Sequence, residues 1–329
     1  MNAIIRTLVG SAFLAVLVVL QPAVAAAQAA LPPPAASGEV LQARFAPPLD
    51  RPLRYRMTMT ELEEGKPVTM VMVQELTFTR NGDGYVMALR WLSLTAGGET
   101  LDLTKGNLPL PPEIAVMIRP VSLELGPTGQ ILRVREWDRY RRELIEAAPA
   151  LAEMMGSNAK DKAEMSVFMT NFFTQFTAVP AERATWLVAY GWPEVMLLAG
   201  TVGRAGAPIS SRHVVQSVYA PEPLNYEFQT RLSRTADGKG LRNVSAGSPD
   251  AAGAKAMAAQ LVAAVMTGLS EGTDIDRSTV EKLFANPKFS TQLDMDLDLQ
   301  TGLPRKAMIV VREKFDGIDQ SSTILLEAL

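Results

Sequence analysis

The sequence predicts an α+β fold: a curved antiparallel β-sheet, with helices inserted mid-chain and packed on one face. Three observations predict it. Polar and apolar residues alternate from Leu53 onward, helical periodicity replaces this alternation between about residues 136 and 198, and strict alternation returns near the C-terminus. Strands followed by inserted helices and then by further strands are typical of an α+β arrangement.

Residues 53–135 are expected to form an antiparallel meander. From Leu53 to Thr60, apolar residues alternate with arginines and threonines, which is the period of a strand with one wet face. The run Asn81-Gly82-Asp83-Gly84 predicts a tight hairpin, because Asn and Gly accept positive φ. Further segments of strand composition are residues 68–79, 85–95, 121–125 and 131–134.

Helical periodicity marks the middle of the chain. Apolar residues over 137–151 recur at steps of three and four, and Pro149 is expected to kink or split that helix. Residues 181–198 are apolar and aromatic and are broken at Gly191 and Pro193. A second helical stripe is formed by Met165, Phe168, Met169, Phe172, Phe173 and Phe176.

The second half of the chain repeats the order of strands and helices. Strands are expected at about residues 211–219 and 224–233. An Ala-rich helix follows Ser248-Pro249-Asp250, whose composition is typical of a helix N-terminus. Ser278 and Glu281 form a capping box for a further short helix.

The last segment is the most regular, and it predicts a three-stranded meander over residues 293–326 with one wet face. Within it, residues 297–305 (LDLQTGLPR), followed by a long strand, resemble the hairpins of periplasmic lipoprotein carriers of the localisation-factor type. The resemblance covers this hairpin and the general order of elements. It implies a curved half-barrel sheet, covered by helices, that holds acyl chains.

The N-terminus has the three parts of a secretory signal peptide. Arg6 gives a positive start, residues 8–20 are apolar, and residues 23–28 are small. The apolar stretch is too short to cross a bilayer, and Pro22 would interrupt a spanning helix. We therefore expect residues 1–27 to be removed on export; an uncleaved membrane anchor is the alternative.

The composition of residues 28–329 indicates two parts. Residues 28–52 are rich in Pro and Ala and are expected to be a flexible leader, and residues 53–329 a single α+β domain with helical segments at about 136–198 and 249–286. The chain has no cysteine, which excludes disulfides. Together with the Ala-rich signal, this favours a Gram-negative periplasm over an animal secretory pathway.

The charge excludes several partners. The sequence has 32 Lys and Arg against 35 Asp and Glu, a net charge of −3. Because it has no run of five basic residues, nucleic acids and anionic membrane surfaces are not expected partners. No apolar run after the signal reaches transmembrane length, so we expect no membrane span in the mature chain.

Catalytic motifs are incomplete in this sequence. His213 is the one histidine, and no G-x-S-x-G elbow accompanies it, so an ordinary strand histidine is the simpler interpretation. Ser157 and Lys160 match S-x-x-K, but the K-T-G and S-D-N motifs of penicillin-recognising enzymes do not follow. We therefore expect no catalytic residues, no enzyme activity and no cofactor.

Three aspartates are weak candidate metal ligands. Asp294, Asp296 and Asp298 have the spacing that opens a calcium-binding loop. Such a loop needs Gly at its sixth position and Glu at its twelfth, where this sequence has Leu299 and Arg305. A solvated strand face whose carboxylates meet basic neighbours is the simpler interpretation, and we expect no metal.

Apolar side chains give the leading functional hypothesis, which is an exported periplasmic binding or carrier protein for a lipid or another hydrophobic ligand. A plain hydrophobic core is the alternative for the same residues. The alternative function is a non-catalytic structural or assembly protein of the envelope, acting through contacts with an envelope protein. The candidate lining residues are Met57, Met59, Phe168, Phe172, Phe176, Trp186 and Trp192.

Overall fold

The computed structural model describes residues 38–63, 66–105, 116, 119–155, 159–189, 191–215, 224–268, 277–316 and 318–329. The predicted signal peptide, the first part of the predicted leader and Ser157 of the S-x-x-K match lie outside these residues. Within the described part of the chain, no helix combines the length and the hydropathy that a membrane crossing requires.

Strands and helices follow the predicted order. The strands are β1 (Val40–Gln42), β2 (Leu53–Glu63), β3 (Lys66–Asn81), β4 (Gly84–Ala96), β5 (Glu99–Asp102), β6 (Val121–Leu125), β7 (Ile131–Val134), β8 (Val202–Arg204), β9 (Pro208–Val215), β10 (Leu224–Arg234), β11 (Gly240–Pro249), β12 (Lys288–Asp298), β13 (Pro304–Phe315) and β14 (Ile318–Ala328). The helices are α2 (Trp137–Met155), α3 (Ala159–Phe176), α4 (Thr185–Val188), α5 (Trp192–Leu197), α6 (Ala251–Gly268) and α7 (Arg277–Leu283).

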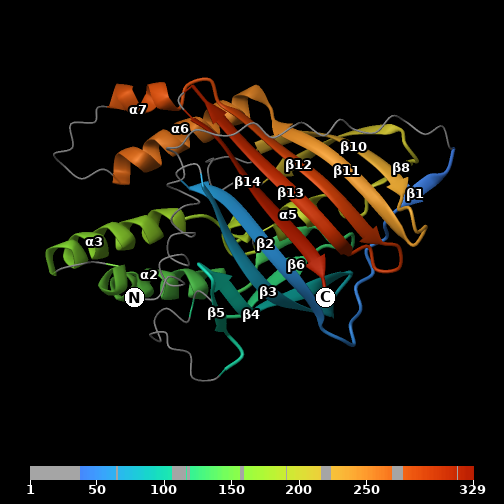
Figure 1. Cartoon of the computed structure of the whole chain (residues 1–329), viewed down its shortest axis with the longest axis horizontal. Coiled ribbons are helices and arrows are strands. Elements are labelled where there is room, and N and C mark those ends of the chain that lie inside the picture. The colour runs from blue at the N-terminus through green and yellow to red at the C-terminus, as the bar shows by residue number, and fades with distance from the viewer. Residues whose placement is uncertain are drawn as a thin grey trace.

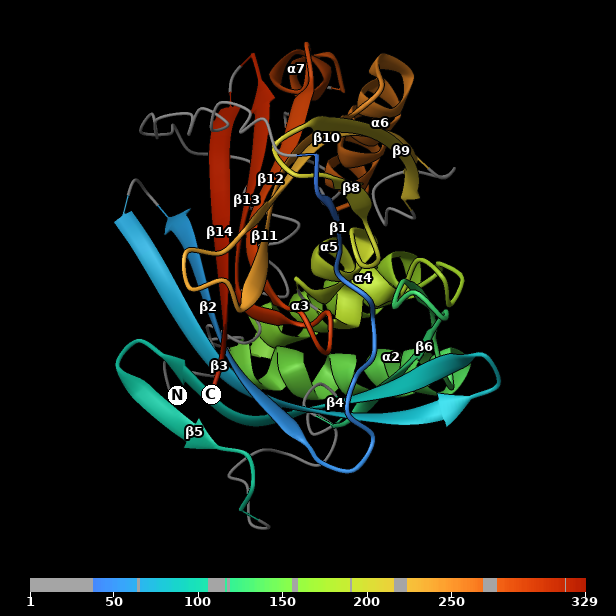
Figure 2. The same ribbon diagram turned by 90° about the vertical axis from the view of Figure 1, so that its right-hand side faces the viewer.

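A large antiparallel sheet dominates the described residues (Figure 1). Its strands follow the order β7-β6-β4-β3-β2-β14-β13-β12-β11-β10-β9, with β5 paired to β4, while β1 and β8 form a separate two-stranded sheet. The sheet is strongly curved: in Figure 2, β3 and β4 pass beneath helices α2 to α5, and β11 to β14 rise beside them. The predicted α+β class with an antiparallel sheet is confirmed.

The last strand joins the two halves of this sheet. Strand β14 pairs with β13 on one side and with β2 on the other, where Leu326 lies opposite Met57 and Ile324 opposite Met59. The first meander, β2 to β7, and the second, β9 to β14, therefore become one sheet through this pairing.

Alternation along the C-terminal strands sets which face is buried. In β12, Leu293, Met295 and Leu297 are buried, and the residues between them are half-exposed, because successive side chains of a strand point to opposite faces. Strands β12, β13 and β14 pair in sequence as an antiparallel meander. The predicted three-stranded C-terminal meander is confirmed.

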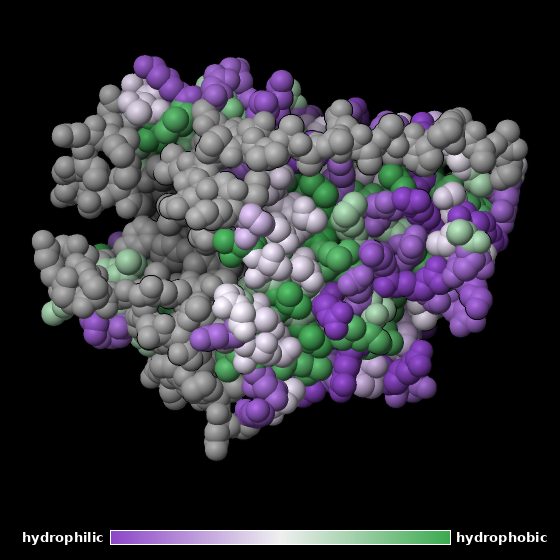
Figure 3. Space-filling model, viewed as in Figure 1, coloured by the Kyte–Doolittle hydropathy of each residue, from purple (hydrophilic) through white to green (hydrophobic). Residues whose placement is uncertain are grey.

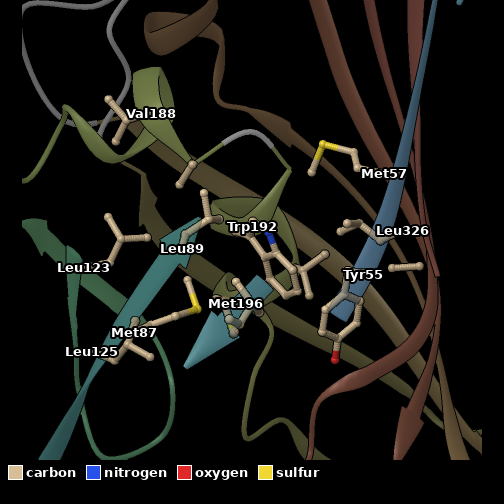
Figure 4. Packing of buried hydrophobic residues seen from close by; sticks show 14 of the residues in the cluster. Tyr55, Met57, Met87, Leu89, Leu123, Leu125, Val188, Trp192, Met196 and Leu326 are labelled. Carbon is tan, nitrogen blue, oxygen red and sulfur yellow. The ribbon is translucent and has the colours of Figure 1, made fainter. Parts of the chain in front are cut away.

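Helix α5 fills the concave side of the sheet. Trp192 is fully buried there, between Tyr55, Met57 and Leu326 on one side and residues of β4 and β6 on the other (Figure 4). Gly191 precedes it with a φ of +73°, and a Cβ at that position would lie 3.2 Å from Ile324 Cγ2. The positive φ therefore favours glycine, and the packing leaves little space for a side chain.

Helix α2 excludes one of the two alternatives expected at Pro149, a split of the helix. It runs without a break from Trp137 to Met155, with Pro149 inside it, so the helix is not split. Proline removes one backbone donor and leaves the carbonyl four residues earlier without its helical partner. Pro149 is exposed, so water can reach this turn of the helix and satisfy that carbonyl.

The described end of the predicted leader packs against the domain. Leu41, Ala43 and Phe45 are all at most 5% exposed. The ring of Phe45 meets that of Tyr85 edge-on, with 5.3 Å between centroids, and the backbone N–H of Ala46 donates to the carbonyl of Thr301 at 2.9 Å. Leu41, Ala43 and Phe45 alternate with Gln42 and Arg44, which is a signal of a half-buried strand, but the run is short and lies within a Pro-rich stretch.

Helices α6 and α7 form a second, smaller hydrophobic core at one end of the sheet (Figure 1). Phe284, directly after α7, meets Phe315 of β13 ring to ring, with centroids 5.0 Å apart, and Phe315 in turn meets Phe289 of β12. Met257 and Val262 of α6 complete this cluster, which is distinct from the core around Trp192.

Candidate functional site

An open groove lies between helices α6 and α7. It holds about 650 Å³, which is within the range of small-molecule binding pockets. The lining is mainly aliphatic and aromatic, with charged side chains among it. It consists of Ala251, Ala254, Lys255, Ala258, Ala259, Val262, Arg277, Glu281, Phe284, Ala285, Asn286, Pro287 and Lys288.

The groove arises from the sequence of α6. Ala251, Ala254 and Ala258 recur at steps of three and four, so they share one face of the helix, and Ala259 lies beside them. Each alanine side chain is a single methyl group, too short to reach across to α7. Larger residues at these positions would fill the space, so the groove is a direct result of the Ala-rich composition.

The floor is apolar and fixed. Phe284 is 3% exposed, and its ring is held by that of Phe315. Val262 of α6 is 5% exposed and belongs to the same cluster. A ligand chain in the groove would therefore meet side chains that the second core already holds in place.

The loop between α7 and β12 is anchored to the end of β13. Asn286 has a φ of +53°, which is uncommon outside glycine. Its side-chain Nδ2 donates to both carboxylate oxygens of Asp316, at 2.9 and 2.8 Å, and the backbone N–H of Asp316 donates to the carbonyl of Ala285 at 3.1 Å. These bonds hold one end of the groove in a single conformation.

The start of α6 is fixed in a similar way. Asp250 Oδ1 accepts a hydrogen bond of 2.7 Å from the backbone N–H of Gly253, as an N-cap aspartate does. The backbone N–H of Asp250 in turn donates to the carbonyl of Asn225 in β10, at 2.9 Å. A helix start is thus confirmed here with Asp250 as its cap, but Pro249 does not lie in the first turn as expected, because Ser248 and Pro249 end strand β11.

Charged side chains of the lining are mostly basic. Lys255, Arg277 and Lys288 carry positive charge, against Glu281 alone. Arg277 Nε donates to Glu281 Oε1 at 2.7 Å, one helical turn away, so these two charges neutralise each other. Lys255 and Lys288 have no ion pair within 4 Å among the described residues.

No family model matches the sequence. No curated protein matches it either. Among solved structures, lipovitellin, in a structure that describes its lipid–protein interactions, is 8% identical with a TM-score of 0.38, over 87% of this chain and 25% of the lipovitellin chain. This chain thus spans about a quarter of that protein's length.

Two further structures match at lower TM-scores. A porin-like protein from Bacteroides uniformis is 10% identical with a TM-score of 0.17, over 84% of this chain and 95% of its own. MucB in complex with MucA is 11% identical with a TM-score of 0.11, over 84% of this chain and 89% of the matched chain. At these TM-scores the likenesses carry no argument about this chain, and the hairpin's resemblance to lipoprotein carriers stays a prediction.

The predicted lining residues divide into three groups. Met57 and Trp192 are fully buried and pack together in the main core, and Met59 is half-buried against it (Figure 4). The remaining side chains lie outside the described part of the structure, although their backbones belong to α3 and α4. They are those of Phe168, Phe172, Phe176 and Trp186.

Two of the three aspartates of β12, Asp294 and Asp298, have separate structural roles. Asp294 forms a two-pronged ion pair with Arg242, at 2.9 and 2.7 Å. Asp298 Oδ1 accepts hydrogen bonds from the backbone N–H groups of Gln300 and Thr301, at 3.0 and 2.9 Å. Among the described residues no group of three or more His, Cys, Asp and Glu is placed to hold a metal ion.

Two carboxylates lie buried near one tyrosine on the inner face of the sheet. Burial raises the pKa of Glu194 to about 7, and it also raises the pKa of Glu313, which accepts a 2.9 Å hydrogen bond from Gln320 Nε2. Burial and then the charges of Glu313 and Glu194 raise the pKa of the Tyr226 hydroxyl. Burial thus shifts all three groups toward their uncharged forms.

His213 lies beside a serine on strand β9. Ser211 Oγ and His213 Nε2 are 2.9 Å apart, and the imidazole meets the ring of Phe228 edge-on. Burial lowers the pKa of His213. A nucleophilic dyad needs a third group to orient the base, and the described residues show no carboxylate bonded to this imidazole.

Sequence reasoning identified the Ala-rich helix but not the groove. The signal was present in α6, which has one charged residue, Lys255, in eighteen positions. A helix that is apolar on all sides needs cover on all sides. The short helix α7 covers only part of it: Ala254 and Ala258 are buried in the second core, and Ala251 and Ala259 are exposed.

The convex face of the sheet carries an uncharged patch, which we call the outer-face patch. In its first row Met308 lies opposite Leu325, Leu325 opposite Thr58, and Thr58 opposite Val71. Met308 is 41% exposed. Hydrophobic and weakly polar atoms gather over these strands in the middle of Figure 3. The second row consists of Val310, Thr323, Thr60 and Thr69.

Proposed function

We propose that this chain is an exported, periplasmic, non-catalytic binding or carrier protein for an apolar, lipid-like chain, which it holds in the groove between α6 and α7. The groove carries the proposal: it is lined by methyl groups and an aromatic ring, and its two ends are fixed by hydrogen bonds. An apolar ligand is also what the sequence favours, but the groove lies at α6 and α7, away from the candidate lining residues Met57 and Trp192.

The physical basis is the burial of apolar surface. Removing a methylene from water contributes about 0.8 kcal/mol, so each methylene that enters the groove strengthens binding by up to about fourfold. Because the groove is already formed, binding requires little reorganisation of the protein. Affinity is therefore expected to rise with chain length until the groove is full.

The test uses the neutral fluorescent hydrophobe N-phenyl-1-naphthylamine as the probe. Ala259 lines the groove and is exposed, so Ala259→Phe places a ring in the groove without disturbing a buried contact. Ala252 is also exposed on α6 but is not part of the lining, so Ala252→Phe is the matched control. We expect Ala259→Phe to weaken probe binding about tenfold and Ala252→Phe to leave it unchanged.

Two results would contradict this proposal. The first is that the purified wild-type protein, freed of lipid, takes up no probe. The second is that both phenylalanine variants bind the probe as tightly as the wild type does. Native mass spectrometry of protein purified from its own host gives an independent check. A retained small molecule that is absent from the Ala259→Phe variant would support the groove as its site.

A second candidate function is assembly with an envelope protein through the outer-face patch. Two adjacent rows of uncharged side chains across four strands, with Met308 41% exposed, favour it. Exposed uncharged patches of this kind are typical of contact surfaces. This function uses the opposite face of the sheet from the main core, so it is compatible with ligand binding at α6.

The corresponding test compares two glutamate substitutions. Met308→Glu puts a charge in the outer-face patch, whereas Val214→Glu puts one on strand β9, where Val214 is 64% exposed. If an envelope partner co-purifies with the wild type, it should be lost with Met308→Glu and kept with Val214→Glu. Retention with both variants would rule out this patch as the contact.

A further inference from the structure

The charge of the groove lining is opposite to that of the chain. The whole sequence has a net charge of −3, whereas the lining has three basic side chains and one acidic one. The ion pair between Arg277 and Glu281 neutralises two of these charges. Lys255 and Lys288 remain as the basic groups that a ligand would meet.

The two lysines come from different elements of the lining. Lys255 lies on α6, among the alanines of the groove face, and Lys288 begins β12 directly after the anchored loop. Lysine side chains lay their methylene stems along apolar surface while the ammonium group stays in water. An ammonium beside an apolar groove is therefore suited to a ligand that has both an apolar and a charged end.

Nearby acidic groups are occupied by other partners. Asp250 accepts from the backbone N–H of Gly253, and Asp316 accepts twice from the side chain of Asn286. Neither aspartate is part of the lining. The carboxylate of Glu281, which is part of it, is held by Arg277.

We infer that the groove binds single-chain amphipaths with an anionic headgroup, the alkyl chain lying on the alanine and phenylalanine floor and the headgroup beside Lys255 and Lys288. This inference rests on the proposed function and adds the class of ligand. Solvent-exposed charge pairs contribute little energy each, so the lysines select among headgroups while the chain provides most of the affinity.

The experiment displaces N-phenyl-1-naphthylamine from the wild-type protein at pH 7.5. The three competitors are decanoate, decanol and decyltrimethylammonium, which share a ten-carbon chain and differ in headgroup charge. We expect decanoate to bind about fivefold more tightly than decanol, and decyltrimethylammonium to bind more weakly than either. The preference for decanoate should shrink as salt is added, because salt screens exposed charges.

Substitution of the lysines tests their role directly. Lys255→Gln with Lys288→Gln should remove the preference for decanoate and leave decanol binding unchanged. Lys239→Gln, on an exposed turn outside the groove lining, is the control and should keep the preference. Unchanged decanol binding also shows that the double variant is folded.

The outcomes separate this inference from the proposed function. Equal binding of decanoate and decanol by the wild type, or a preference that survives the loss of both lysines, overturns the inference and leaves the groove as an apolar site. Failure of the wild type to take up the fluorescent probe overturns the proposed function itself.

Discussion

The indole Nε1 of Trp192 donates a hydrogen bond of 2.9 Å to the side-chain Oε1 of Gln74, and both residues are fully buried. Gln74 lies on β3, and Trp192 begins α5, 118 positions later in the chain. The amide Nε2 of Gln74 contacts Met57 Sδ at 4.0 Å, a weak hydrogen bond to sulfur. Gln74 thus fixes the orientation of Trp192, which packs on the concave side of the sheet.

We predict that Gln74→Met destabilises the protein by about 1–3 kcal/mol, because it leaves the buried indole N–H without a partner. The free energy of unfolding in urea measures this. The control, Gln229→Met on an exposed strand face, should change it by less than about 0.5 kcal/mol. In the Gln74→Met variant, Trp192→Phe should lower the free energy of unfolding by less than it does in the wild type. Equal losses in the two backgrounds would argue against the hydrogen bond.

We predict that Glu194 lowers the stability of the protein as the pH rises from about 4.5 to about 7, against the smaller opposite effect of His213, whose pKa burial lowers. Burial raises the pKa of Glu194 from its ordinary value of 4.5 to about 7 in the folded protein, so folding favours its protonated form. Its stabilising effect is full below pH 4.5 and is lost as the pH rises through 7, by about 3 kcal/mol. Burial raises the pKa of Glu313 as well, which acts in the same direction.

The variant Glu194→Gln isolates this group. Because glutamine carries no charge at any pH, the variant should lose most of the decline in stability between pH 5 and 7, as measured by urea unfolding at several pH values. The exposed residue Glu227 provides the control, and Glu227→Gln should keep the wild-type decline. An identical pH profile for wild type and Glu194→Gln would show that Glu194 does not titrate in this range.

We predict that Asp298 has a structural role. Its carboxylate accepts hydrogen bonds from three donors of the turn, which are the backbone N–H groups of Gln300 and Thr301 and the hydroxyl of Thr301. Asp298→Ala removes this acceptor and should lower the free energy of unfolding by about 1–2 kcal/mol. Asp296→Ala, on the same strand face, should cost less than about 0.5 kcal/mol. Thermal unfolding measures both, and calcium should not change the wild-type Tm. A Tm raised by calcium in the wild type but not in Asp298→Ala would instead indicate a metal site.

Local sequence patterns predicted most of the elements. Alternation indicated the meander of β12 to β14, and the Asn81-Gly82 run indicated the turn between β3 and β4, because these signals depend only on near neighbours. The pairing of β14 with β2 is not visible in such patterns, since it joins residues more than 250 positions apart. The burial of Phe45 depends on a contact with Tyr85 and was missed for the same reason.

The candidate site was harder to predict than the fold. Met57 and Trp192 were selected because they are large and apolar, but such residues favour filled space, and these two pack against each other in the core. The groove instead comes from Ala251, Ala254 and Ala258, whose small side chains leave space. An open site between elements depends on what faces a side chain across the gap, and a single sequence does not give that information.

The position of β14 between β13 and β2 also has a consequence for how the protein matures. The two meanders join only through the final strand, Ile318–Ala328, so a growing chain cannot complete its sheet while this strand is still inside the ribosome. A chain cut short before Ile318 would expose the free edges of β2 and β13, and unpaired strand edges promote aggregation.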